Sequence, residues 1–220
     1  MNYAALVSAI SSYTENTFPT VDMNVFITQA EKRIYNAVQI PALRKNVTGV
    51  TTASNKYLAC PDDYLSSYSL AAINPTTGAY TYLLNKDVNF IREAYPKPTS
   101  TGSPKYYALF GPAVISSVIT VELSFIIGPT PDAAYSMELH YYYYPESITS
   151  AGTTWLGDNY DPVLLYGTLV EAYTYMKGEQ DMVLLYNTKF GEALVQLKRL
   201  GDGLERQDAY RSGQARIPVT

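Results

Sequence analysis

Residues 137–145 read Met-Glu-Leu-His-Tyr-Tyr-Tyr-Tyr-Pro and indicate a β-strand with aromatic side chains on both faces. Successive side chains of a strand point to opposite sides of the sheet. One face is apolar: Met137, Leu139, Tyr141 and Tyr143. The other is amphipathic: Glu138, His140, Tyr142 and Tyr144. Tyrosine suits surfaces that are part apolar and part wet, so we expect a strand covered on both sides, with another subunit as one candidate cover. The pattern favours a chain built to assemble rather than to catalyse.

Strand patterns also fill the sequence before this stretch. Residues 67–73 and 79–84 flank Asn74-Pro-Thr-Thr-Gly78, a turn-forming sequence that predicts a hairpin. Residues 119–127 alternate, which predicts one strand with Ser124 among its outward side chains. Asp87 is expected to cap a short helix over residues 88–94. Short strands separated by prolines predict a small antiparallel sandwich or barrel.

Helical patterns lie on either side of this β region. Residues 22–38 carry an apolar stripe, with Asp22 as the expected N-cap. Asp161 as N-cap and Pro162 at the first helical position predict a helix that ends near Gly178. A second helix over 181–200 follows a short link, which predicts an antiparallel helical hairpin.

The predicted fold class is therefore α+β. A discontinuous helical core, residues 1–45 and 150–200, receives an inserted β domain over residues 46–149. Residues 201–220 show neither helical nor strand periodicity and are expected to form an extended C-terminal tail. The expected structural anchors are Trp155, Asp161, Tyr141 and Tyr143. The tail side chains expected to bind a partner are Arg206, Tyr210, Arg211, Arg216, Ile217 and Val219.

Composition restricts the classes of function. Charged residues make up 16% of the 220, below the roughly 25% of ordinary soluble domains, whereas 22 residues are tyrosine. Aromatic enrichment with charge depletion is typical of interface cores. A net charge of −4 argues against a dedicated nucleic-acid binder. No apolar run is long enough to span a membrane, and no secretory signal is recognisable, so we expect synthesis in a cytoplasm.

The candidate catalytic residues have simpler structural interpretations. His140 is the single histidine and lies within a strand, and Cys60 is the single cysteine, beside Pro61. Asp62-Asp63 and the pair Asp158/Asp161 suit turn and capping positions better than calcium or acid–base sites. We therefore expect no enzyme activity, no metal and no cofactor. Two alternatives stay open, namely a tyrosine-rich carbohydrate-binding or tail/receptor-interaction module, and a hydrolase that uses paired carboxylates.

Several motifs, in order, resemble the head-to-tail connector, or adaptor, proteins of tailed bacteriophages. They are Ile27-Thr-Gln-Ala-Glu-Lys-Arg-Ile34, Pro41-Ala-Leu-Arg44, Pro61-Asp-Asp-Tyr-Leu65, Gly102-Ser-Pro-Lys-Tyr-Tyr107, Pro129-Thr-Pro-Asp-Ala-Ala-Tyr135, Leu139-His-Tyr-Tyr-Tyr-Tyr-Pro145, Trp155-Leu156 and Leu164-Leu-Tyr-Gly-Thr-Leu-Val-Glu-Ala172. Together they cover roughly residues 22–200.

The resemblance implies a non-enzymatic virion protein made in the host bacterial cytoplasm. It implies a homo-oligomeric ring of twelve copies beneath the portal protein, joined below to a tail tube or nozzle protein. Double-stranded DNA would pass through such a ring during ejection without sequence-specific binding, and no membrane partner is implied. Residues 201–220 resemble family tails that dock on the portal.

Overall fold

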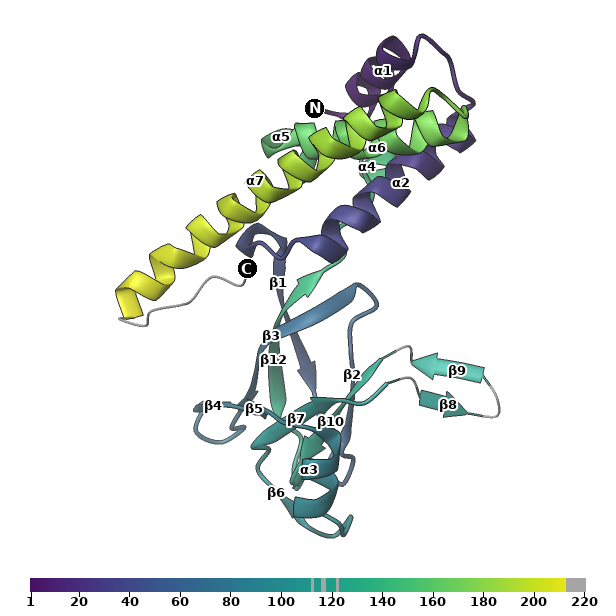
Figure 1. The fold of residues 1–220 in the computed structure, drawn as a ribbon. Helices are drawn as coiled ribbons and strands as arrows, with labels where there is room; N and C mark the ends of the chain where they lie inside the picture. The colour runs from purple at the N-terminus through teal and green to yellow at the C-terminus, as the bar shows by residue number, and fades with distance from the viewer. Residues whose placement is uncertain (112, 116–117, 122, 213–220) are drawn as a thin grey trace. The chain divides into compact units, whose positions relative to one another are not determined.

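The computed structural model describes residues 1–111, 113–115, 118–121 and 123–212 (Figure 1). Its internal contacts divide the chain into two compact units. The helical unit comprises Met1–Leu43 and the described residues from Pro145 onward, and the β unit comprises Arg44–Tyr144. The predicted α+β class is confirmed.

The helical unit is built around one central helix. Its elements are α1 (Tyr3–Thr14), α2 (Thr20–Ala37), the 3-10 turn η1 (Pro41–Leu43), α4 (Ile148–Ala151), α5 (Trp155–Asn159), α6 (Asp161–Tyr175) and α7 (Gln180–Ser212). Helix α6 contacts α1, α2, α5 and α7, so it is covered on several sides. This position explains its run of buried residues from Val163 to Leu165 and again from Gly167 to Val170.

Because Gly167 has no side chain, α6 can approach α2 and α7 closely at this position. A Cβ atom built there would lie 2.9 Å from Phe190 Cε2 on α7 and 3.2 Å from the Cβ of Ala30 on α2. Both distances are at or below the limit of ordinary carbon contacts, so this crossing requires glycine or a shift of its neighbours.

A buried carboxylate joins the two sequence segments of the helical unit. Glu31 on α2 is almost fully buried, and its Oε1 accepts a hydrogen bond from the Ile148 backbone N–H at 2.9 Å. Burial raises the pKa of Glu31, and hydrogen bonds with Ile148 and Ser147 only partly oppose that rise. Glu31 therefore anchors the start of α4 against α2.

The β unit contains two four-stranded sheets. The first has the order β1-β12-β3-β4, formed by β1 (Arg44–Val50), β12 (Ser136–Tyr143), β3 (Tyr64–Ile73) and β4 (Tyr80–Tyr82). The second has the order β2-β10-β7-β5, formed by β2 (Tyr57–Ala59), β10 (Ser124–Gly128), β7 (Tyr106–Leu109) and β5 (Leu84–Asn85). Two short pairs complete the unit: β6 (Thr101–Gly102) with β11 (Thr130–Pro131), and β8 (Ala113–Ile115) with β9 (Val118–Val121).

The expectation of an entirely antiparallel β domain is wrong for two strand pairs. Strand β5 pairs in parallel with β7, and β6 pairs in parallel with β11. Neither four-stranded sheet closes into a barrel among the described residues. Side chains of β3 and β12 share one apolar core with those of β7 and β10, so the two sheets bury a common set of residues.

The strand predicted over 119–127 is interrupted, because β9 ends at Val121 and β10 begins at Ser124. Ser124 was expected to face outward but is buried, and its hydroxyl donates to the Gly111 carbonyl at 3.0 Å. Strand β10 is buried along its whole length because helix α3 (Val88–Ala94) covers the face opposite the shared core. The predicted Asp87 cap is confirmed, since its side chain accepts from the Asn89 backbone N–H.

Three helix boundaries differ from their predictions. Helix α2 begins at Thr20 after Pro19, so Asp22 lies inside its first turn rather than at the N-cap. Asp161 is likewise the first helical residue of α6, and Tyr160 takes the cap position. A carboxylate in a first turn still interacts favourably with the positive end of the helix dipole. At the other end of α6, Lys177 rather than Gly178 adopts the left-handed conformation, with φ 54°.

The prediction of an extended tail from residue 201 is wrong for residues 201–212, which continue α7 to Ser212. Gly201 does not end the helix. A larger residue would not fit at this position, because a Cβ there would collide with the side chain of Ile40. The glycine serves a close packing contact within the helical unit and leaves the helix intact. Residues 213–220 lie outside the described residues.

Candidate interaction surface

A β-bulge turns Tyr68 away from the shared core of the β unit. His140 pairs with Ser69 and Tyr141 pairs with Ser67, so Tyr68 is an extra residue in β3. Ser67 takes the inward position instead, and its Oγ accepts a hydrogen bond from the Tyr107 hydroxyl at 3.2 Å. Without the bulge, the alternation from Leu70 would bury Tyr68; with it, the ring lies exposed on the outer face of the first sheet.

Arg44 stands between aromatic rings on this outer face. Its Cζ lies 3.9 Å from the ring centre of Tyr68 and 4.9 Å from that of Tyr142. Its Nη2 also donates to the Tyr142 hydroxyl at 2.6 Å. A guanidinium group over the face of an aromatic ring is attracted by the ring quadrupole, so both ring contacts help to hold the Arg44 side chain in place.

His140 packs edge-on against Tyr68, with ring centres 5.1 Å apart. Burial lowers the pKa of His140, and the nearby charge of Arg44 lowers it further, against a smaller opposing effect of Glu138. His140 is therefore neutral at pH 7, and Arg44 supplies the positive charge of this group.

Strand β4 extends the aromatic surface along the edge of the sheet. The rings of Tyr80 and Tyr82 are stacked with centres 6.4 Å apart, and both are exposed. The Tyr80 hydroxyl lies 3.5 Å from Glu138 Oε2. This contact places Tyr80 and its stacked neighbour Tyr82 on the same outer face of the sheet. We call the whole set the aromatic face: Arg44, Tyr68, Tyr80, Tyr82, His140 and Tyr142.

A second polar group holds the end of β12. Asp63 accepts hydrogen bonds from Lys45 Nζ at 2.6 Å and from the Tyr141 hydroxyl at 2.7 Å. Partial burial opposes ionisation of Asp63, but these two donors outweigh it and lower the pKa of the carboxyl. Lys45 Nζ also lies 4.1 Å from the ring centre of Tyr143. Tyr141 is buried and Tyr143 half-buried, and Asp63 is committed to a structural contact.

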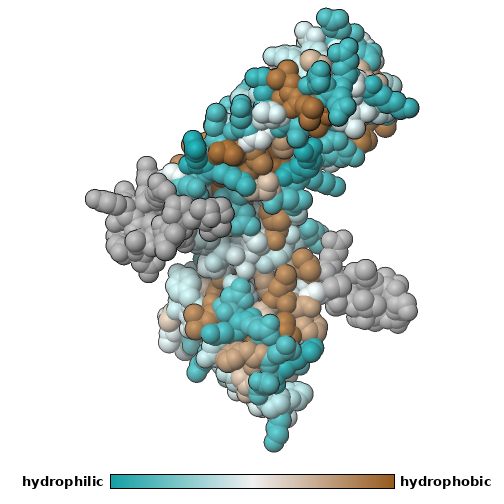
Figure 2. Space-filling view, in the orientation of Figure 1, coloured by the Kyte–Doolittle hydropathy of each residue, from teal (hydrophilic) through white to brown (hydrophobic). Residues whose placement is uncertain are grey.

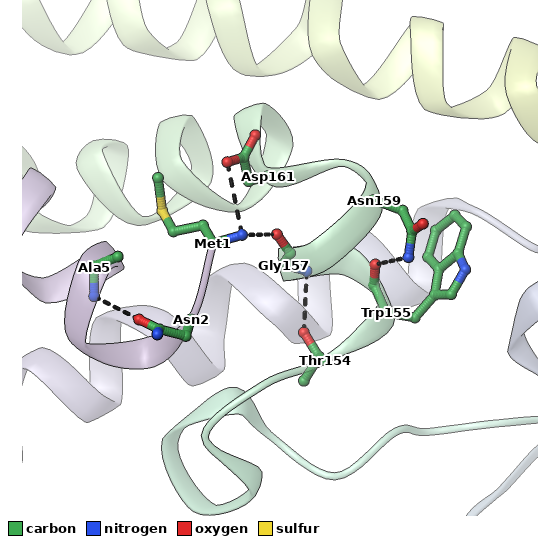
Figure 3. A network of polar contacts seen from close by, with 8 residues as sticks. All are labelled: Met1, Asn2, Ala5, Thr154, Trp155, Gly157, Asn159 and Asp161. Carbon is green, nitrogen blue, oxygen red and sulfur yellow. Dashed lines mark hydrogen bonds and ion pairs between the residues drawn. The ribbon is translucent and has the colours of Figure 1, made fainter.

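Trp155 and Asp161 lie in a polar network of the helical unit (Figure 3). The Met1 backbone nitrogen donates to the Gly157 carbonyl and lies 3.9 Å from Asp161 Oδ2. The Trp155 carbonyl accepts from Asn159 Nδ2 at 2.9 Å. The Trp155 side chain was expected to be a buried anchor, but it is only half-buried, against the edge of the helical core.

The predicted tail residues are not brought together into a described site. Arg206, Tyr210 and Arg211 fall within α7, whereas Arg216, Ile217 and Val219 lie outside the described residues. Sequence reasoning missed Arg44 and Tyr68, which come together only through the pairing of β1 with β12 and the bulge in β3.

The described residues offer little for catalysis. They contain no group of three histidine, cysteine, aspartate or glutamate side chains placed to hold a metal ion. Cys60 is buried, and burial raises the pKa of its thiol to about 12, so it is a poor nucleophile at pH 7. No described helix has both the length and the apolar character needed to cross a membrane.

The family description "SU10 adaptor protein" matches residues 1–218. The chain belongs to the SU10 adaptor protein family. No curated protein matches it. The family is one of phage head-to-tail adaptors and is structural rather than enzymatic, so the adaptor is a structural component of the virion that associates with other virion components.

Proposed function

We propose that the adaptor forms a closed homo-oligomeric ring, of twelve copies, beneath the portal. In this role it joins the capsid to a tail tube or nozzle protein and surrounds the channel through which double-stranded DNA leaves. The observation that carries the proposal is the family match over residues 1–218. Contacts between two different surfaces of identical subunits close into a ring when the rotation between neighbours permits.

The aromatic face supports an assembly role. Interface cores are enriched in tyrosine and arginine, and the aromatic face combines four tyrosines with Arg44. Arg44 is held by its ring contacts before any partner arrives, so little side-chain entropy is lost on binding. The net charge of −4 also suits a DNA channel, because a basic lumen would hold passing phosphates.

Residues 206–219 are proposed to dock on the portal or on a neighbouring subunit. Tyr210, Ile217 and Val219 would supply apolar anchors, and three arginines would meet partner carboxylates: Arg206, Arg211 and Arg216. Deleting residues 213–220 leaves α7 whole, and a docking role for them predicts an unchanged melting temperature together with weaker binding to purified portals. Normal portal binding by that deletion variant would remove Arg216, Ile217 and Val219 from the docking segment.

Native mass spectrometry of connector complexes released from virions tests the ring directly. The expected result is a single species of twelve copies, with or without bound portal. A monomer or dimer in those complexes would overturn the proposed function.

Substitutions test the part played by the aromatic face. Tyr82→Ser should reduce incorporation into particles, because it removes an exposed ring without touching a core. Tyr57→Ser is the matched control, since Tyr57 is an exposed tyrosine on β2 of the second sheet. Equal incorporation of both variants, with loss of glycan binding only for Tyr82→Ser, would favour the carbohydrate-binding alternative.

A further inference from the structure

The first sheet of the β unit ends on one side in a long edge strand without the usual protection. Strand β1 pairs with β12 without a register shift, and no other described strand pairs with it (Figure 1). Proteins usually protect such an edge with proline, a bulge or charged side chains. The two charged residues of β1, Arg44 and Lys45, are held by contacts inside the β unit. Residues 46–50 are exposed and contain neither a charge nor a proline, so this part of β1 can accept another strand.

Strand β4 forms the opposite edge of the same sheet and is also uncharged. Among the described strands it pairs with β3 alone. Its three residues, Tyr80, Thr81 and Tyr82, are all exposed. Figure 2 shows apolar areas, in brown, that interrupt the hydrophilic surface of the β unit. The sheet therefore presents, at both of its edges, a strand whose backbone N–H and C=O groups can pair with another chain.

The strand directions allow this sheet to continue from one copy of the chain into the next. Strands β1, β12, β3 and β4 alternate in direction, so β1 and β4 run antiparallel to each other. A rotation about an axis along the strands keeps their directions, so β4 would meet β1 of the next copy as an antiparallel pair. In the second sheet, β2 and β5 run in the same direction and would form a parallel pair, which is slightly less stable. Only the first of these two sheets can continue in the antiparallel pattern.

The two edges of the first sheet also match in register. Residues that pair from strand to strand form two rows across the outer face: Val50, Ser136, Ile73 and Tyr80 in one, and Thr48, Glu138, Ala71 and Tyr82 in the other. A continuation without stagger would place Val50 of the next copy beside Tyr80, and Thr48 beside Tyr82. Val50 and Tyr82 are 63% and 67% exposed, so both edges hold side chains that a neighbouring strand would cover. Pairs of an aromatic and a β-branched residue stabilise adjacent strands.

We propose that β4 of one copy pairs with β1 of the next copy, so that the first sheets of neighbouring copies join edge to edge. The two edges are different surfaces, which makes the contact heterologous, and heterologous contacts close into a ring when the rotation between copies permits. Strand β4 has three residues, so each contact is short, but a closed ring holds every copy at both edges. The inference rests on the proposed ring and deepens it by naming the strands that neighbouring copies share.

Disulfide trapping in connectors assembled in particles tests this contact. Two test variants each carry two substitutions: Val50→Cys with Tyr80→Cys, and Thr48→Cys with Tyr82→Cys. Within one chain the paired positions are three strand spacings apart, about 14 Å, which is too far for a disulfide. Mild oxidation should therefore link neighbouring copies and give a ladder of covalent multimers in a denaturing gel without reductant. The native Cys60 is buried, so it should not contribute to the ladder.

The matched control combines Val50→Cys with Thr81→Cys, because Thr81 is next to Tyr80 in sequence but lies on the opposite face of β4. The control should give about tenfold less covalent multimer than the test variants, because only a slip of one residue would bring its two thiols to the same face. Equal ladders from the control and the test variants, or no ladder from either test variant, would overturn the inference.

Native mass spectrometry of virion connectors separates this inference from the proposed function. A ring of twelve together with no ladder would refute the edge-to-edge contact and leave the ring standing. A ladder from the test variants in the absence of a ring would refute the ring and retain the contact.

Discussion

Glu31 offers a sharp test of how the helical unit is held together, because one buried carboxylate joins α2 to the segment that returns after the β unit. In Glu31→Ala, the backbone N–H of Ile148 loses its acceptor, and Ile148 is fully buried. An unsatisfied buried donor costs about 1–3 kcal/mol, so the free energy of unfolding should fall by that amount. Glu31→Gln keeps a carbonyl acceptor of nearly the same shape and should cost less.

The comparison with Glu31→Gln should also depend on pH. Burial raises the pKa of Glu31 in the folded state above its ordinary value of 4.5, so the folded protein holds this proton more tightly than the unfolded chain. The free energy of unfolding of the wild type should therefore fall as pH rises from 4.5 through the folded pKa. Glu31→Gln lacks this titration, so its stability relative to the wild type should increase over the same window.

Urea denaturation followed by the fluorescence of Trp155 measures these effects, since this single tryptophan lies in the helical unit. The control is Glu171→Ala, which removes a more exposed carboxylate paired with Arg33 on the protein surface. Such pairs contribute about 0–1 kcal/mol, so the control should change little. Equal losses for Glu31→Ala and Glu31→Gln, with no dependence on pH, would refute the capping role.

Gly167→Leu should lower the free energy of unfolding by about 1–3 kcal/mol in urea titrations, because the helix crossing has no room for a side chain. Gly191→Ala, at an open position on α7, should instead raise it by up to about 1 kcal/mol. Trp155→Ala should cost less than the about 3–5 kcal/mol of a fully buried tryptophan, and a larger loss of stability would contradict its half-buried position. Tyr141→Phe should cost about 1.5–3 kcal/mol at pH 7, measured by circular dichroism, because it removes a hydrogen bond to the ionised carboxylate of Asp63. The pKa of Asp63 in the folded state lies below its ordinary value of 3.8, so the ionised carboxylate stabilises the fold above pH 3.8. The stability advantage of the wild type over Asp63→Asn should therefore shrink as pH falls through the folded pKa. A difference in stability that stays constant with pH would contradict this prediction.

Sequence periodicity correctly predicted the strands in which successive side chains alternate between two faces of different polarity. The apolar set of β12 could be identified because Met137, Leu139 and Tyr141 alternate, and all three are buried. The same rule failed at Ser124, because a strand covered on both faces has no polar side to recognise. Glycine was equally ambiguous at Gly201, where it allows close packing inside a helix that the sequence alone indicated should stop.

The candidate surface was harder to predict than the fold. Four consecutive tyrosines indicated an aromatic face, but the sequence could not show that Tyr68 joins it, since a bulge depends on the partner strand. Arg44 stands at the start of β1, almost a hundred residues before Tyr142, and only the register of β1 with β12 brings them together. The one feature of the sequence that could have indicated this contact was a basic residue at the start of a predicted strand, in a chain that also holds a tyrosine-rich strand.

The division of the chain into 1–43, 44–144 and 145 onward has a consequence for synthesis on the ribosome. Every strand of the β unit has been made before Pro145 emerges, so the β unit can fold while translation continues. Helix α2 has no such opportunity, because α4, α6 and α7, against which it packs, are all translated later. The apolar face of α2 must therefore stay uncovered while about a hundred residues are added, at roughly 5–20 residues per second. During those seconds the nascent adaptor exposes a surface on which a chaperone, or a neighbouring nascent copy, could act.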